Sequence, residues 1–209
     1  MNMLKPVAYF VRHGSTELND AGKFRGPVDV SLDDKGKEQA EELGNFFKSR
    51  KFSAAYHSSK KRTLQTIEPI LEKSKSKIKP KMVKDFDAFN VGELSGKPKD
   101  KENLATIRYY QDNPDEKIPR GERLNDFRKR TDPKIMMAIH KGEASKYPSI
   151  SVVHSSIVHE LSQLLHGDHN KVKVAPGGVV GVYKDDQDPS GYKAIALTKE
   201  IKHSEDMVS

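Results

Sequence analysis

The sequence predicts an α/β fold, a three-layer sandwich in which helices cover both faces of a central, mostly parallel β-sheet. Short apolar runs alternate with segments whose apolar residues recur at helical spacing, which is the pattern of strands joined by helices. Two of the apolar runs end in a histidine. Because the carboxyl ends of parallel strands lie at one edge of a sheet, we expect these histidines to meet there.

The first half of the chain predicts two strand-and-helix units. A buried strand at 7–11 runs into Arg12-His13-Gly14, and Ser31 to Asp34 offers N-cap residues for the first helix. The apolar positions of that helix are Ala40, Leu43, Phe46 and Phe47. A short strand at 53–56 then leads into a second helix, whose apolar positions are Leu64, Ile67, Ile70 and Leu71.

The second half predicts further elements of both kinds. The expected elements are a strand at 82–86, a helical patch at 104–110, helix between Leu124 and Ile139, a strand at 150–153 that ends in His154, a helix at 157–165, and a hairpin of strands at 179–183 and 192–197. Pro133 is expected to break the helix or to start a new one.

The length of the chain fits one sizeable domain, because it has 209 residues. We expect residues 1–198 to form this domain. A polar, proline-containing excursion at about 92–121 is expected to act as a lid, and residues 199–209 form a polar tail.

Composition restricts the chemistry. The 37 Lys and Arg residues exceed the 30 acidic residues, which favours anionic ligands. The absence of cysteine excludes disulfides, thiolate nucleophiles and cysteine-bound zinc. We see no signal-peptide core and no membrane span, so a cytoplasmic protein without membrane contact is expected.

Three other patterns have simpler interpretations. The basic run at 73–84 lacks interleaved aromatic residues, so a solvated loop is favoured over a nucleic-acid site. His166 and His169 have a spacing that suits a metal, but Gly167 and Asp168 between them indicate a helix end, and no metal site is expected. Gly177-Gly178 is not followed by Lys-Ser/Thr, so it predicts a turn into a strand and no phosphate-binding loop.

The segment from Phe10 to Asn19 resembles the signature of the histidine phosphatase (phosphoglycerate mutase-like) superfamily, in which an apolar strand precedes Arg-His-Gly, a threonine and an asparagine. Further matches follow in order, at Gly26, Asp29, Ser31-Leu32, Gly36, Ser58-Ser59, Arg62, Thr66, Gly92-Glu93-Leu94-Ser95-Gly96, Gly121-Glu122 and Val152-Val153-His154. The resemblance covers roughly residues 7–165. It implies an enzyme that forms a phosphohistidine on the histidine of this motif, here His13.

The chemistry of phosphoryl transfer suits these residues. The transferred group spreads negative charge over its oxygens, so the site needs preplaced cations and donors. We expect Arg12 and Arg62 to bind it in bidentate fashion, and His154 to donate a third contact when protonated. The expected substrate-binding residues are Gly14, which keeps the backbone thin, Thr16, Asn19, Glu93 and Ser155.

One departure from the family concerns the proton donor. Family members place a glutamate where this chain has Ala88. Asp87 is the favoured substitute, and Glu93 and Asp85 are the alternatives. Without any of them, the enzyme would prefer good leaving groups such as phosphohistidine or aryl phosphates. Other departures are Ser155, where a glycine is usual, and Arg123, where a serine is usual, while Glu122 is either functional or only a helix cap.

These expectations combine into one function. The chain is expected to be a metal-independent phosphomonoesterase that needs no cofactor and acts on a small phosphorylated substrate. The alternatives are a phosphoglycerate-type mutase and a phospholigand-binding pseudoenzyme without the usual acid. The sequence leaves the substrate and the oligomeric state open.

Overall fold

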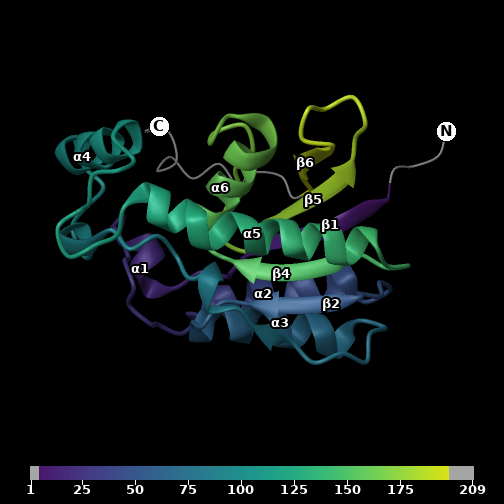
Figure 1. Ribbon diagram of the computed structural model, residues 1–209. Coiled ribbons are helices and arrows are strands. Elements are labelled where there is room, and N and C mark those ends of the chain that lie inside the picture. Colours follow the sequence, from purple (N-terminus) through teal and green to yellow (C-terminus); the bar gives the residue numbers. More distant parts are fainter. Residues whose placement is uncertain (1–4, 198–209) are drawn as a thin grey trace.

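The computed structural model describes residues 5–197, which form a six-stranded mixed sheet with helices on both faces (Figure 1). The elements are β1 (Pro6–Arg12), α1 (Glu17–Asp20), α2 (Asp34–Phe47), β2 (Ala54–His57), α3 (Lys61–Lys73), β3 (Lys81–Met82), η1 (Lys84–Phe86), η2 (Gly92–Leu94), α4 (Lys101–Asp112), α5 (Leu124–Glu143), β4 (Ser149–Val153), α6 (Ser155–His166), β5 (Val179–Lys184) and β6 (Tyr192–Ala196). The expected tail at 199–209 lies outside the described residues.

The sheet confirms the predicted fold class. Its strand order is β3-β2-β4-β1-β5-β6, and β1, β2, β3 and β4 are mutually parallel where they pair. The hairpin of β5 and β6 is antiparallel, and β5 also pairs antiparallel with β1. Since β1, β4 and β2 are parallel neighbours, their carboxyl ends lie at one edge. The residues that directly follow these strands, His13, His154 and Ser58, therefore start from adjacent points.

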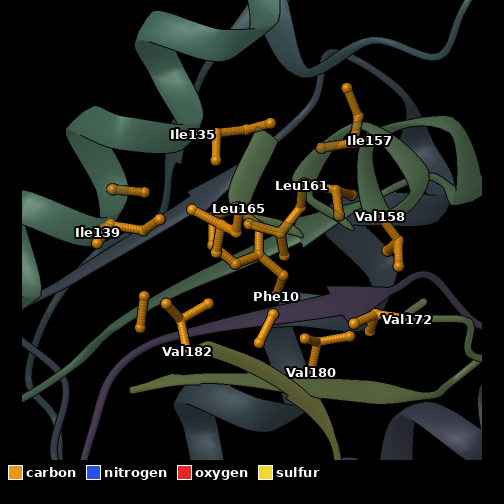
Figure 2. Packing of buried hydrophobic residues seen from close by; sticks show 14 of the residues in the cluster. Phe10, Ile135, Ile139, Ile157, Val158, Leu161, Leu165, Val172, Val180 and Val182 are labelled. Carbon is orange, nitrogen blue, oxygen red and sulfur yellow. The ribbon is translucent and has the colours of Figure 1, made fainter. Parts of the chain in front are cut away.

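Alternation along β1 divides the core into two halves. Ala8 and Phe10 face α5 and α6, in the cluster that Figure 2 shows around Phe10 and Leu161. Tyr9 and Val11 face the other way, toward the apolar residues of α2 and α3. All four β1 side chains are at most 1% exposed. Burial on both faces holds this strand in place, and so it fixes the position of the polar residues at its end.

Three local predictions were wrong. The strand expected at 82–86 is only two residues long, and a 3₁₀ turn takes its place from Lys84 to Phe86. Pro133 lies inside α5 and does not break it, since Phe127 and Ile139 on either side are buried in the core and hold both parts of the helix. Phe46 is 45% exposed, because Phe47 takes the core position beside Leu43.

The helical patch expected at 104–110 is confirmed as part of α4. No residue of this helix is buried, and Figure 1 shows it at one end of the molecule, apart from the layers of the sandwich. Within residues 5–197, no helix has the length and apolar character needed to cross a membrane.

Candidate active site

His13 follows β1 and is 1% exposed. Its Nδ1 atom lies 2.6 Å from the carbonyl oxygen of Gly14, which can only accept, so Nδ1 carries the proton. Nε2 is then unprotonated and accepts a hydrogen bond of 2.8 Å from the Nη1 atom of Arg25. Burial, followed by the positive charge of Arg25, lowers the pKa of His13 well below its usual value. The geometry thus presents a neutral imidazole whose free lone pair is on Nε2.

Three arginines supply positive charge around this nitrogen. Arg12 donates to the carbonyl of Val174 at 2.8 Å, and the fully buried Arg62 donates to the carbonyl of Val28 at 3.0 Å. Burial and the other guanidinium groups lower the pKa of Arg25 to about 9, and burial lowers that of Arg62 to about 10, so both are largely charged at neutral pH.

The charge on two of these arginines lacks a direct counterion. Within residues 5–197, neither Arg25 nor Arg62 has a carboxylate at ion-pair distance, and the buried Nε atom of each has no hydrogen-bond acceptor. Burying cations without counterions is costly. The arrangement is therefore suited to an anionic ligand that supplies several acceptor oxygens.

His154 follows β4, and its ring centroid lies 5.2 Å from that of His13. Its Nδ1 atom faces Arg62 Nη2 at 3.3 Å, and since arginine can only donate, Nδ1 accepts and Nε2 donates to Ser58 Oγ at 2.8 Å. Burial and the nearby arginines lower the pKa of His154 well below its usual value. His154 is therefore neutral in this arrangement. The donor role expected for it requires a proton, which a bound anion would favour.

The segment after His13 positions a further donor. The side-chain oxygen of Asn19 accepts from the backbone N–H of Thr16 at 3.1 Å and from its hydroxyl at 3.0 Å. Asn19 also lines a cavity of about 910 Å³, and its amide nitrogen is left as a donor to a ligand. Thr16 does not line the cavity, so its contribution is to orient Asn19.

Position 14 requires glycine for a different structural reason from the one expected. A Cβ atom at Gly14 would lie 2.6 Å from the carbonyl oxygen of Gly36, and one at Gly36 would lie 2.1 Å from that of Ser15. The two glycines thus allow the loop after β1 to approach the first turn of α2. Asp33 ties the same contact together by accepting from Gly36 N and Ser15 Oγ.

The three candidate proton donors have contacts that do not include His13. Asp87 accepts hydrogen bonds from the backbone N–H and from the hydroxyl of Ser59, and the hydroxyl oxygen lies within 2.8 Å of both carboxylate oxygens. Asp87 does not line the cavity, whereas Ala88 does. Glu93 lies beside Arg120 at 3.5 Å, and Asp85 beside Lys134 at 3.8 Å. The position of Asp87 gives no geometric support to the proton-donor role predicted for it.

Glu122 has a structural partner that the sequence did not suggest. It accepts from the backbone N–H of Asn90 at 2.7 Å and pairs with Arg130 at 2.8 Å. Arg130 in turn donates to the carbonyls of Asp85, Asp87 and Ala88. The pair therefore fixes the loop that contains Ala88, and Glu122 does not act as a helix cap.

His13, His154 and the three arginines line a cavity of about 910 Å³. Ser155, the first residue of α6, also lines it, as do several residues of α4. The cavity is of the size of small-molecule sites and much larger than one phosphate.

His166 and His169 each contact a different partner. His166 Nε2 accepts from the backbone N–H of Ala194 at 3.2 Å, and His169 Nε2 accepts from Arg128 at 3.1 Å. Among residues 5–197, no group of three potential ligands is placed to hold a metal ion.

Sequence reasoning missed Arg25. The loop that holds it is tied to residues 96–97 by backbone hydrogen bonds, from the N–H of Phe24 to the carbonyl of Lys97 at 2.9 Å and from the N–H of Gly96 to the carbonyl of Phe24 at 2.7 Å. The only available signal was a basic residue directly before Gly26 in the matched loop, which is weak in a chain so rich in lysine and arginine.

Replacing Arg25 with glutamine is expected to raise the pKa of His13, because one cause of its lowering is removed. If neutral His13 is the reactive form, the acidic limb of the pH profile of kcat/KM moves to higher pH, and kcat/KM falls roughly 10²-fold through lost charge stabilisation. Kinetics and an NMR titration of His13 measure both effects. Lys35→Gln, at an exposed position on α2, is the charge-matched control. An unmoved acidic limb contradicts the role assigned to Arg25.

A profile of the histidine phosphatase superfamily (branch 1) matches residues 8–183. The chain therefore belongs to this superfamily, as the motif around His13 predicted. Phosphoglycerate mutase 2 of Saccharomyces cerevisiae is 36% identical over 103 residues, which are 46% of this chain and 33% of the mutase. The match thus spans about a third of that relative's length.

Solved structures extend the likeness over nearly the whole chain. A phosphoglycerate mutase of Thermus thermophilus is 25% identical with a TM-score of 0.66, covering 91% of this chain and 98% of that one. A mycobacterial glucosyl-3-phosphoglycerate phosphatase has 15% identity and a TM-score of 0.72, covering 91% and 96%, which shows a shared fold. The similar proteins thus include both mutases and phosphatases.

Proposed function

We propose that the protein is a metal-independent phosphohydrolase that forms a phosphohistidine intermediate on Nε2 of His13. The observation that carries the proposal is the state of this nitrogen. Its lone pair is freed by the hydrogen bond from Nδ1–H to Gly14, and Arg12, Arg25 and Arg62 surround it. An unprotonated nucleophile within a group of cations is what attack on a phosphate ester requires.

In the first step, the Nε2 lone pair forms a bond to phosphorus while the bond from phosphorus to the ester oxygen breaks. The electron pair of that bond leaves on the ester oxygen, which takes a proton from solvent. In the structure, Arg25 donates a hydrogen bond to this lone pair. Before Nε2 attacks, the guanidinium must release Nε2 and donate to the phosphoryl oxygens instead. In the second step, a water oxygen attacks phosphorus, the N–P electron pair returns to Nε2, and one proton of the water passes to a phosphate oxygen or to solvent. Phosphate is released and His13 is regenerated.

Other residues stabilise the transferred group. Arg12 and Arg62 offer guanidinium donors, and the amide nitrogen of Asn19 adds a neutral one. His154 becomes a donor once the anion raises its pKa. Ser155 contributes from the N-terminus of α6, where backbone N–H groups favour negative charge.

Treatment with EDTA is expected to leave phosphate release unchanged, because guanidinium groups supply the positive charge that a divalent ion would otherwise provide. Initial rates with 4-nitrophenyl phosphate, before and after chelation and gel filtration, measure this. Loss of activity that Mg²⁺, Mn²⁺ or Zn²⁺ restores would contradict the metal-independent mechanism.

A phosphoglycerate mutase is the second candidate, favoured by the similarity to the yeast mutase. A mutase must return the phosphoryl group to an acceptor before water reaches it. The decisive test follows labelled phosphate from a bisphosphate primer in the presence of phosphoglycerate. Label in inorganic phosphate supports the hydrolase, and label in isomerised phosphoglycerate supports the mutase.

A pseudoenzyme that only binds phosphorylated ligands remains the third candidate. Steady-state hydrolysis of an aryl phosphate that disappears on His13 replacement would exclude it. We further propose a small phosphorylated substrate and a cytoplasmic location, for which metabolite screening and cell fractionation are the tests.

A further inference from the structure

The cavity offers apolar surface next to the reactive histidine. Phe89, Val91 and Phe127 line it from the body of the domain, and Leu104 and Ile107 line it from α4. Val91 and Phe127 are 9% and 1% exposed, and the Phe89 ring packs edge-on against Phe127 with centroids 5.3 Å apart. The buried Phe127 therefore holds the Phe89 ring in place, and an apolar ligand gains by covering the half-buried side chains of Phe89, Leu104 and Ile107.

The additional lysine and arginine side chains of the cavity have a different character. Lys23, Lys99, Lys101 and Arg108 line it but are exposed to solvent, and Lys173 lines it in a half-buried position. Solvated cations attract anions from a distance and contribute little to the recognition of a second charged group. The part of the ligand beyond its phosphate therefore meets the apolar side chains of Phe89, Leu104 and Ile107 beside cations that are mostly solvated.

The same cavity lacks a carboxyl group beside His13. Among residues 5–197, the acidic residues that line it are Asp112 and Glu160. Asp112 is the exposed last residue of α4. Glu160 lies 3.3 Å from Arg128 and six residues after His154, about 9 Å away along α6. Burial raises the pKa of Glu160 to about 7, and its carboxyl group contacts Arg128.

We infer, on the basis of the proposed function, that the substrate class is aryl phosphate monoesters, with the aromatic ring held between α4 and the Phe89–Phe127 pair. The ring is what the apolar wall fits. An aryl oxygen also leaves without help, since the pKa of a phenol is about 10, whereas alkoxides require a proton donor.

The reaction balances without a side-chain acid. Nε2 of His13 forms the N–P bond, the P–O bond to the ring breaks, and its electron pair leaves on the aryl oxygen as a phenolate. Solvent water then protonates the phenolate. Hydrolysis of the N–P bond releases inorganic phosphate, and the second proton of the attacking water goes to a phosphate oxygen or to solvent.

The test measures single-turnover phosphorylation of His13 by four donors: 2-naphthyl phosphate, phenyl phosphate, benzyl phosphate and acetyl phosphate. Benzyl phosphate has a ring but an alkoxide leaving group, and acetyl phosphate has a good leaving group but no ring. We expect phenyl phosphate to exceed benzyl phosphate by about 10²-fold or more in kcat/KM, and naphthyl phosphate to exceed phenyl phosphate. Equal rates for phenyl and benzyl phosphate would overturn the inference while leaving the proposed function intact.

Substitutions on α4 test whether the apolar wall binds the aromatic ring. Leu104→Gln and Ile107→Gln should each lower kcat/KM for naphthyl phosphate about 10-fold and leave that for acetyl phosphate within about 2-fold. Thr106→Gln, on the same helix but outside the cavity lining, is the matched control. An equal loss of kcat/KM for naphthyl phosphate and for acetyl phosphate would contradict the inference that this wall binds the aromatic ring.

Substitutions at acidic residues and at Ala88 test the inference that no side chain protonates the leaving oxygen. Asp87→Asn and Glu160→Gln should change the rate of His13 phosphorylation by phenyl phosphate and by benzyl phosphate by the same factor. Ala88→Glu should selectively accelerate phosphorylation by benzyl phosphate. A selective loss with benzyl phosphate in either of the first two would identify a resident acid and overturn the inference. If no donor phosphorylates His13, the proposed function fails together with the inference.

Discussion

Replacing His13 with alanine is expected to abolish the phosphoenzyme and to reduce phosphate release by roughly five orders of magnitude or more, to background. The reason is that its Nε2 atom is the attacking group and that water, without it, must displace the ester directly. The measurement combines steady-state release from 4-nitrophenyl phosphate with trapping of the intermediate.

The control for this variant must separate chemistry from folding, because His13 is 1% exposed. Circular dichroism and thermal unfolding should show a folded His13→Ala protein. His140→Ala, at an exposed position on α5, should retain full activity. A folded His13→Ala protein with normal turnover would refute the mechanism.

The second large effect is expected at Arg62. Arg62→Ala should lower kcat/KM by roughly two to four orders of magnitude, because the guanidinium stabilises charge that grows in the transition state. Arg62 also contacts His154 Nδ1 at 3.3 Å, so the variant removes a partner of the second histidine as well. Rates measured with 4-nitrophenyl phosphate, with protein stability checked in parallel, test this.

Arg62→Lys refines the interpretation. It keeps a positive charge but loses the planar fork, so an intermediate loss of about 10²-fold separates bidentate binding from simple charge. Arg50→Ala, an exposed arginine beyond α2, serves as the control. Wild-type rates in both Arg62 variants would remove this residue from the site.

The strand ends were predictable because each is encoded locally. Apolar runs before His13 and His154 indicate buried strands, and parallel neighbours bring their ends together without any knowledge of side-chain packing. The same local logic located α2 and α6, and Asp33 caps α2 by accepting from Gly36 N.

The remaining features depend on tertiary contacts. The position of Arg25 follows from a loop held by the backbone of residues 96–97, which no local pattern encodes. The direction of Asp87 follows from its hydrogen bonds to Ser59, and the helix through Pro133 persists because the residues on either side of it are buried. In each case a contact between distant segments outweighs a local preference.

The most direct test of the central claim is to identify the phosphorylated atom. Rapid quenching during turnover of a labelled aryl phosphate, followed by peptide mass spectrometry and ³¹P NMR, locates the group. The structure predicts an acid-labile, alkali-stable phosphoryl group on Nε2 of His13, because Nδ1 is engaged by the Gly14 carbonyl. Phosphate on Nδ1, on His154 or on any other residue, or normal turnover without a phosphoenzyme, would contradict it.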